Sequence, residues 1–286
     1  AARTIDLDLL LCGELKIRQQ SPELDLEVPH PRLAERLFVL EPLAELAPDL
    51  MHPVLGKSVR QMLEECREKQ RPGRDLAGLR VLVTGSTSGI GRAIALELAG
   101  AGARVIVHGR RSPARAEETA ERCRAHSGQS AALLADLRVP ADCVRLVDAG
   151  WSLWNGLDAW INNAGADTLT GEAAHWPFEK KLEELWAVDV RAAMLLSRRA
   201  GRLMKERGAG LILTMGWDQA ETGMEGDSGE LFAAVKGAVM AFTKSLALSL
   251  APQVRVNCLA PGWIRTAWGE GASTGWQERV LRETPL

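Results

Sequence analysis

The sequence predicts two units, of which the larger, residues 77–286, is an α/β domain built on a doubly wound parallel sheet. After residue 77, short apolar runs alternate with longer amphipathic stretches. Strands separated by helical stretches of this length form βαβ units, whose parallel sheet is covered by helices on both faces. The composition also changes across the charged stretch 66–76, which carries Pro72 and Gly73. Because Pro-Gly pairs mark loops, we expect a linker at 71–76 between domains at 1–70 and 77–286.

The apolar runs and amphipathic stretches give the expected elements of the larger domain. Strands are expected at 80–84, 103–108, 131–135, 157–162, 210–215 and 254–260. Helices are expected at 89–101, 112–126, 140–155, about 179–207 and 229–250. The order is one strand followed by one helix throughout, as a doubly wound sheet requires.

The composition indicates a cytoplasmic protein without a nucleic-acid or membrane partner. Its net charge of −2 gives no field that favours nucleic acid or an anionic membrane. The five cysteines are scattered and form no C-x-x-C pair, so neither zinc nor a disulfide framework is indicated. No apolar run approaches the roughly 18 residues of a membrane span. The chain begins without Met and ends without a clear terminal element, so we expect a fragment at both ends.

A glycine-rich turn between the first strand and the first helix predicts a nucleotide site. Gly85, Gly89 and Gly91 stand in this turn, together with Ser88 and Ile90. Glycine allows a tight turn and lets the backbone approach a pyrophosphate closely, while the helix N-terminus offers free N–H groups. The alternative is an ordinary strand–helix turn.

Two arginines at the end of the second strand favour NADP over NAD. An NAD site normally has Asp or Glu here to hold the ribose 2′-hydroxyl, whereas this chain has Arg110 and Arg111. Guanidinium groups bind phosphate in a bidentate manner, which suits a 2′-phosphate. The alternative is a solvated basic loop.

Together these motifs resemble the short-chain dehydrogenase/reductase family, which has a Rossmann-like fold. They are TG-x-x-x-G-x-G at 84–91, Asp136 after the third strand, NNAG at 162–165 and PGWIRT at 261–266. The resemblance implies that Asp136 contacts the adenine. It implies a seven-stranded sheet, whose last strand would lie beyond residue 286, and a dimer or tetramer formed through the two long helices. The further cofactor-binding residues that it implies are Asn162, Ala164, Gly165, Pro261, Gly262, Ile264 and Thr266.

The catalytic positions of that family are largely changed in this chain. The family uses a tyrosine as acid, a lysine four residues later, a serine after the fifth strand and an asparagine in the long helix. Here Lys236 is retained, but Phe232 stands at the tyrosine position and the chain contains no tyrosine. Gly216 and Trp217 follow the fifth strand, and Asp189 stands at the asparagine position.

A carboxyl group near the expected cleft could replace the missing acid. The segment after the fifth strand is rich in Asp and Glu, and Asp218 directly follows the strand end. A carboxyl group can act as an acid where burial favours its neutral form. The alternative is a mobile lid of solvated acids. Lys236 could also serve cofactor binding alone, and Trp217 could stack on a flat substrate or cap the core.

The front of the chain carries ARTIDLDLLLCG at 2–13 and LEVPHPRLAERLFVLEPLAELAPDLMHP at 26–53. Through these segments residues 2–53 resemble the C-terminal half of 6-hydroxymethyl-7,8-dihydropterin pyrophosphokinase, which implies a partial α+β domain of ferredoxin-like type. On a strand, Asp6 and Asp8 point to one face, where two carboxylates can bind the Mg²⁺ that bridges ATP phosphates. Taken alone, this pattern is also that of an edge strand with hydrated acids. The N-terminal half of the kinase is absent. The resemblance implies roles in phosphate binding or pterin stacking for Arg3, Arg36, His30 and Phe38.

The leading hypothesis is a fragment of a bifunctional protein of folate or pterin metabolism. It joins part of an Mg²⁺- and ATP-dependent pyrophosphokinase to an NADP(H)-dependent reductase-like domain, with a pterin as a candidate substrate. In the alternative hypothesis the second domain is a non-catalytic NADP-binding scaffold or sensor. Reduction of an ordinary ketone ranks last, because that reaction most needs the missing phenol.

Overall fold

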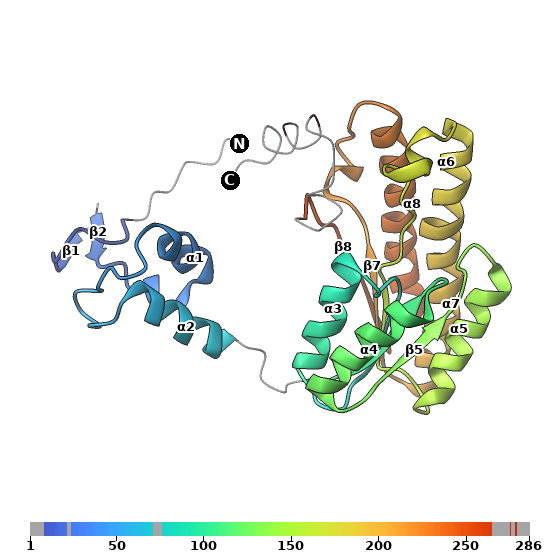
Figure 1. The fold of residues 1–286 in the computed structure, drawn as a ribbon, viewed down its shortest axis with the longest axis horizontal. Helices are drawn as coiled ribbons and strands as arrows, with labels where there is room; N and C mark the ends of the chain where they lie inside the picture. Colours follow the sequence, from blue (N-terminus) through green and yellow to red (C-terminus); the bar gives the residue numbers. More distant parts are fainter. Residues whose placement is uncertain (1–8, 22–23, 71–75, 265–274, 276–277, 279–286) are drawn as a thin grey trace. The chain divides into compact units, whose positions relative to one another are not determined.

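The computed structural model describes residues 9–21, 24–70, 76–264, 275 and 278 of the 286-residue chain. The chain divides into two compact units, residues 1–73 and 74–286 (Figure 1). The division falls inside the stretch that the sequence marks as a linker.

The first unit combines a β-hairpin with two helices. Strands β1 (Ile17–Ser21) and β2 (Leu24–Val28) pair antiparallel. A 3₁₀ turn at Leu33–Glu35 precedes helices α1 (Leu37–Leu46) and α2 (Val59–Gln70). Their contact forms a small apolar core of Leu33, Val39, Leu40, Val59, Met62, Leu63 and Cys66. Within the described residues the sheet has two strands, so the ferredoxin-like sheet stays a prediction.

The second unit is the doubly wound parallel sheet that the sequence predicts. The sheet order is β5-β4-β3-β6-β7-β8, and all neighbouring strands are parallel. The strands are β3 (Arg80–Val83), β4 (Arg104–Gly109), β5 (Ser130–Leu134), β6 (Ala159–Asn162), β7 (Gly210–Met215) and β8 (Val254–Leu259). Each lies within two residues of its expected place. The described residues contain six strands of this sheet, and the expected seventh stays a prediction.

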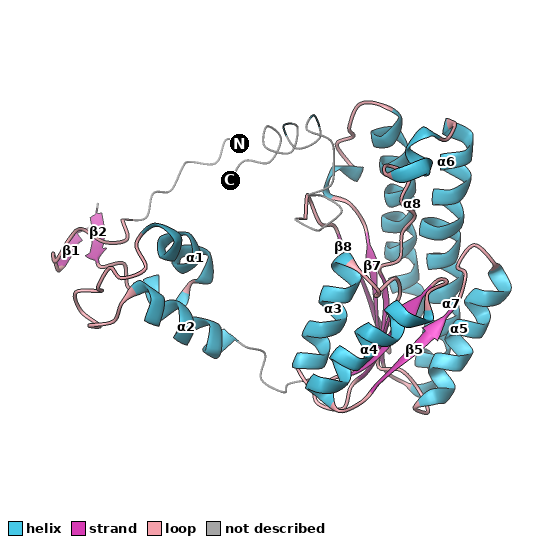
Figure 2. Cartoon of the chain, in the orientation of Figure 1, coloured by secondary structure: helices cyan, strands magenta, loops and turns pink. Residues whose placement is uncertain are grey.

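Helices cover both faces of this sheet (Figure 2). They are α3 (Gly89–Gly100), α4 (Pro113–Ser127), α5 (Pro140–Leu153), α6 (Phe178–Leu185), α7 (Ala193–Arg207) and α8 (Asp227–Leu250). Short 3₁₀ turns lie at Gly171–His175 and Asp218–Ala220. The expected long helix at 179–207 contains a π-helical turn, Trp186–Ala192, between α6 and α7. Such turns are often found at functional sites, and this one contains Asp189.

The two sheet faces bury alternate residues of each strand, because successive strand side chains point to opposite sides. Val81 and Val83 pack with Ala95 of α3 and Ala120 of α4, whereas Leu82 faces the other side. The cluster on that other side comes from β4, β6, β7, α5, α7 and α8, and includes Ile106, Trp160, Ile212, Leu146, Leu196, Met204 and Leu246. The core therefore holds all the central strand ends in place.

Helix α8 is long and apolar enough, by length and composition, to cross a membrane. In this fold it contributes Leu231, Val235 and Val239 to one apolar cluster and Leu246 and Leu250 to another. Core helices of globular domains share this composition, so the helix carries no membrane argument.

We predict that Leu82→Ala lowers the free energy of unfolding of the second unit by about 2–5 kcal/mol, because it leaves a cavity in the centre of the sheet. The side chain of Leu82 is fully buried. Leu79→Ala is the matched control: Leu79 is 39% exposed just before the same strand, so its change should stay within about 0.5 kcal/mol. Urea unfolding of both variants measures the difference, and equal losses would contradict the described packing.

Candidate nucleotide cleft and substrate cavity

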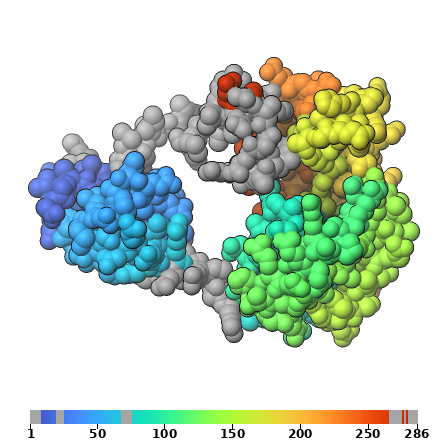
Figure 3. Space-filling view, in the orientation of Figure 1, coloured from blue at the N-terminus to red at the C-terminus, as the bar shows by residue number. Residues whose placement is uncertain are grey.

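A long cleft of about 920 Å³ lies at the carboxyl ends of the central strands. The sheet order reverses between β3 and β6, and ligands of open α/β sheets bind in the crevice at such a switch point. Two borders of the cleft, the start of α4 and helix α6, lie on the face shown in green and yellow in Figure 3. The predicted cofactor residues that line it are Gly85, Ser88, Gly89, Ile90, Gly91, Arg110, Asp136, Ala164, Gly165 and Lys236.

Close contacts within this turn require glycine at two of its positions. Gly85 has a φ of +63°, and a Cβ added there would lie 2.8 Å from Cα of Ala164. A Cβ at Gly91 would lie 2.3 Å from Nδ2 of Asn163 and 2.4 Å from the carbonyl oxygen of Gly85. Helix α3 begins at Gly89, and its Ser88 cap makes no side-chain hydrogen bond to the first turn. The N-terminal N–H groups of α3 can therefore receive a phosphate, as a dinucleotide requires.

A buried histidine, His108, hydrogen-bonds to the backbone of this turn. Nδ1 of His108 accepts from the backbone N–H of Gly85 at 3.0 Å, and Nε2 lies 3.1 Å from the carbonyl oxygen of Ala135. These partners require a neutral ring with its proton on Nε2. Burial lowers the pKa of His108 to about 4. This residue was not among the predicted site residues, although a histidine within the apolar strand VIVHG is a visible signal.

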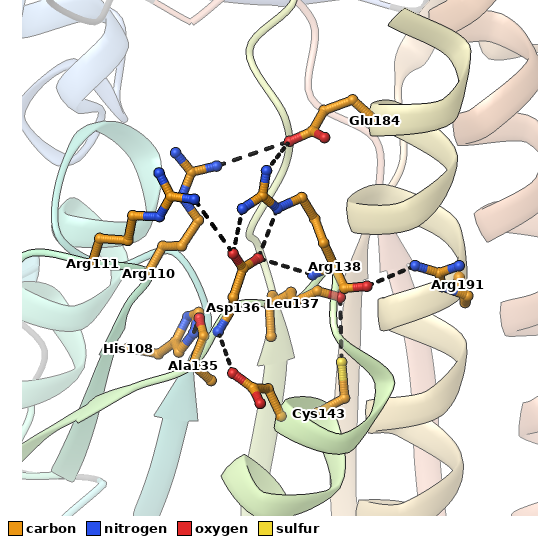
Figure 4. A network of polar contacts seen from close by, with 11 residues as sticks. His108, Arg110, Arg111, Ala135, Asp136, Leu137, Arg138, Cys143, Glu184 and Arg191 are labelled. Atoms are coloured by element: carbon orange, nitrogen blue, oxygen red, sulfur yellow. Dashed lines mark hydrogen bonds and ion pairs between the residues drawn. The ribbon is translucent and has the colours of Figure 1, made fainter. Parts of the chain in front are cut away.

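Three arginines gather around two carboxylates at the far end of the cleft (Figure 4). Arg138 donates to Asp136 through Nε at 2.9 Å and through a second, shorter bond, and it lies 3.6 Å from Glu184. Arg110 lies 3.8 Å from Glu184, and Arg111 lies 4.0 Å from Asp136. The hydrogen bonds from Arg138 lower the pKa of Asp136 to about 2. Arg138 was not predicted from sequence, because it follows β5, whereas the predicted pair Arg110 and Arg111 follows β4.

Of the two consecutive asparagines, Asn163 lines the cleft and the predicted Asn162 does not. The side chain of Asn162 is buried away from the cleft, where Oδ1 accepts from Nε1 of Trp160 at 2.9 Å and Nδ2 donates to Ser197 at 2.8 Å. Asn163 lines the cleft instead and donates from Nδ2 to the carbonyl oxygen of Thr84 at 3.0 Å. Because strand side chains alternate, only one of two consecutive asparagines can face the cleft.

Lys236 is paired with Asp189 inside the cleft. Nζ of Lys236 lies 2.8 Å from Oδ1 of Asp189, and these side chains are 13% and 1% exposed. Oδ2 of Asp189 accepts from the backbone N–H of Ala166 at 2.9 Å. A Cβ at Gly165 would lie 3.0 Å from this carboxylate, so the glycine leaves room for it. The two predicted catalytic residues are thus brought together as a buried ion pair.

A second, smaller cavity of about 230 Å³ adjoins the long cleft through Phe232 and Lys236, which line both. The rings of Trp217 and Phe232 meet edge to face, with centroids 6.3 Å apart. We call this the aromatic cavity. Its lining residues are Ile90, Leu169, Gly216, Trp217, Met224, Ser228, Phe232, Lys236, Pro261, Gly262, Trp263 and Ile264. Ser228 was missed from sequence because helix α8 begins earlier than the pattern indicated.

Asp218, the predicted replacement acid, lines neither the long cleft nor the aromatic cavity. It is exposed, and its Oδ1 accepts from the backbone N–H of Gln219 at 2.8 Å. Its carboxylate lies against the backbone of Gly262, where a Cβ would be 2.8 Å from Oδ2. The burial that this role requires is therefore not present. Thr266 lies outside the described residues.

The predicted kinase residues are only partly described. Arg3, Asp6 and Asp8 lie outside the described residues. His30 lines a cavity of about 350 Å³ in the first unit, and its Nδ1 accepts from the backbone N–H of Arg32 at 3.1 Å. The guanidinium of Arg36 lies 5.7 Å from the ring centroid of Phe38, which is 72% exposed. The described residues contain no cluster of three metal-binding side chains.

Comparison with known proteins supports both sequence resemblances in part. Residues 80–275 match the family model described as short chain dehydrogenase, and residues 1–48 match that of 7,8-dihydro-6-hydroxymethylpterin-pyrophosphokinase. The correspondence of the latter segment to the C-terminal half of the kinase stays a prediction.

Relatives of similar length match the larger unit. The chain is 30% identical to tropinone reductase-like 3 of Erythroxylum coca, over 72% of this chain and 78% of that protein. It is 33% identical to a 3-oxoacyl-(acyl-carrier-protein) reductase of Aquifex aeolicus, over 74% and 84%. A short chain dehydrogenase from Burkholderia cenocepacia, solved in complex with NADP, has a TM-score of 0.64 and 31% identity, over 72% of this chain and 83% of that one.

We predict that Gly91→Ala weakens nucleotide binding at least tenfold and destabilises the unit, since the added Cβ collides with Asn163 and Gly85. Gly100→Ala is the matched control at the other end of the same helix, where an added Cβ meets nothing within 4 Å. Titration with NADPH followed by its fluorescence measures affinity. Equal behaviour of the two variants would contradict the close approach.

We predict that His108 makes stability depend on pH between 6.5 and 4. Its pKa falls from an ordinary value near 6.5 to about 4 in the fold, so the unfolded chain binds the proton more readily in this window. The free energy of unfolding should therefore fall by about 3 kcal/mol as pH drops from 6.5 to 4. In His108→Gln this slope disappears, and in the exposed His126→Gln it remains. An unchanged slope in His108→Gln would refute the assignment.

Proposed function

This chain belongs to the short-chain dehydrogenase family through residues 80–275, and from that membership we propose that its second unit binds NADP(H) and reduces a small flat substrate. The observation that carries the proposal is the junction of the two spaces. The long cleft suits a dinucleotide, the aromatic cavity suits a ring, and Phe232 and Lys236 border both. A ligand in the cavity would therefore lie against one in the cleft.

The residues of the cleft fit a nicotinamide dinucleotide. The glycine turn and the N-terminus of α3 would hold the pyrophosphate, because the Ser88 side chain does not cap the first N–H groups of the helix. The arginine cluster supports NADP(H), since Arg110 and Arg111 are half-exposed or more and can turn toward a 2′-phosphate. When bound, such a nucleotide supplies a hydride. Lys236 and Asp189 would fix the ribose side of the site.

The cavity favours a small planar substrate. Its volume of about 230 Å³ is below the common range for drug-sized ligands, about 300–1,000 Å³. Aromatic rings such as Trp217 and Phe232 offer stacking or edge contacts to a flat ring. A conjugated C=N group also depends less on a strong acid than a ketone does. The kinase-family match at residues 1–48 makes a pterin the preferred candidate.

For the first unit we propose a part in ATP-dependent pyrophosphoryl transfer to a pterin. Asp6 and Asp8 would bind Mg²⁺, and the support is the family match over residues 1–48 together with that pair of carboxylates. We further propose a homo-oligomer formed through the long helices of the second unit.

A second candidate function is NADP(H) binding without turnover, as a scaffold or sensor. One observation favours it: the ammonium of Lys236 is engaged by Asp189 at 2.8 Å rather than left to activate a phenol. In this case the chain would keep its nucleotide cleft while its chemistry is lost.

We predict that the 286-residue chain oxidises NADPH when supplied with a 7,8-dihydropterin or an oxidised pterin. The double variant Lys236→Met with Asp189→Asn removes both charges of the buried pair together, which avoids leaving one uncompensated. It should lower turnover by about 10²-fold through loss of positioning. Lys244→Met, an exposed lysine of the same helix, is the matched control. Absorbance at the NADPH maximum gives the rate.

Binding separates the two candidate functions. NADPH fluorescence that shows tight binding together with zero turnover on every pterin would establish the scaffold or sensor instead. Equal affinity for NADPH and NADH would remove the preference that we assign to the arginine cluster.

A further inference from the structure

One hydroxyl in the aromatic cavity has no assigned role. Ser228 lies in the first turn of helix α8 and lines the cavity. Among the described residues, no group hydrogen-bonds to its Oγ. Apart from the indole rings, the only other side chain of the cavity lining with a polar end is Lys236. The cavity thus presents a hydroxyl to whatever it holds.

The two positions where the family carries a hydroxyl side chain, 216 and 232, have none in this chain. A Cβ at Gly216 would lie 2.8 Å from Sγ of Cys258 and 2.9 Å from Cγ of Met240, so a serine there would displace both side chains. Position 232 carries a phenyl ring that can neither donate nor accept. Neither position offers a hydrogen bond to a substrate.

The spacing along α8 places the hydroxyl of Ser228 on the same side of the helix as Phe232 and Lys236. Ser228, Phe232 and Lys236 are each four residues apart, so they follow one another on one side of the helix at steps of about 6 Å. Phe232 and Lys236 border both spaces, while Ser228 borders the aromatic cavity alone. One N–H of Lys236 is already directed to Asp189. Ser228 therefore lies one helical turn before position 232, where the absent phenol would be, and lines the aromatic cavity without lining the long cleft.

We propose that Ser228 is the residue that hydrogen-bonds and orients the substrate in the aromatic cavity, in place of the absent tyrosine and serine. This inference rests on the proposed function of the same site. A hydroxyl donates one hydrogen bond and accepts up to two, so it suits a ring with a nitrogen or carbonyl oxygen at its edge. The apolar walls disfavour a charged substrate, because the one ammonium of the lining, that of Lys236, is already paired with Asp189. The ligand class is an uncharged, flat heterocycle.

Ligand binding tests this role without relying on turnover. The full chain is saturated with NADP⁺, which prevents reduction, and titrated with 7,8-dihydropterin in a calorimeter. Ser228→Ala should weaken binding about 3- to 10-fold, the effect of one lost neutral hydrogen bond. Ser228→Thr keeps the hydroxyl and should retain most of the affinity. Ser245→Ala, at an exposed position of the same helix, should change nothing.

A double-variant cycle tests whether Ser228 substitutes for the phenol. Phe232→Tyr places a hydroxyl one turn away in the same cavity, so the loss caused by Ser228→Ala should shrink in that background. Independent effects of the two changes on affinity and on turnover would show that the hydroxyls do not share a ligand.

The outcomes distinguish this inference from the proposed function. Turnover and binding that are both unaffected by Ser228→Ala overturn the role of Ser228 and leave the reductase intact. Binding that is weakened by Ser228→Ala, together with zero turnover in the parent chain, supports the role and overturns reduction. If the parent chain neither binds nor reduces the dihydropterin, the uncharged-heterocycle class is wrong and both fall.

Discussion

The close approach of two backbone turns at the switch point of the sheet is the constraint on which the site depends. The turn after β3 touches the segment after β6, with room for no side chain at Gly85 or Gly91. Thr84 ties the two together, because its Oγ1 accepts from the N–H groups of Asn163 and Ala164 at 2.9 and 3.0 Å. This contact opens the N-terminus of α3 to the cleft.

The ion pair at the other end of the cleft follows from a charge balance. A lysine beside a tyrosine has the phenol oxygen as a polar neighbour. Phe232 offers no such oxygen. An uncompensated ammonium in a site this closed would cost several kcal/mol. Asp189 supplies the compensating charge from the π-helical turn, and Gly165 leaves the space for it. The changes at 232 and 189 are therefore physically consistent with one another.

Much of this arrangement could be predicted from sequence, and the misses have physical causes. The strands were placed well because both sheet faces are buried, which makes each strand a continuous apolar run. The glycine turn was found because backbone contacts leave a mark in residue type. Asn163 was missed because an NNAG motif does not say which asparagine faces the cleft. Arg138 and Ser228 were missed because their roles depend on partners distant in the chain, which no local pattern encodes.

The position of Asp218 in the sequence does not predict where its carboxylate lies in the structure. Its place after β7 suggested an acid at the cleft, yet the turn after the strand directs its carboxylate against the backbone of Gly262. A carboxyl group needs burial to act as a proton donor in place of a phenol, and this exposed side chain is not buried. The groups left around the cavity are an engaged ammonium, a serine hydroxyl and aromatic walls. Under the function proposed above, such a site would orient a substrate well and protonate it poorly, which favours rings whose reduction needs little help from an acid.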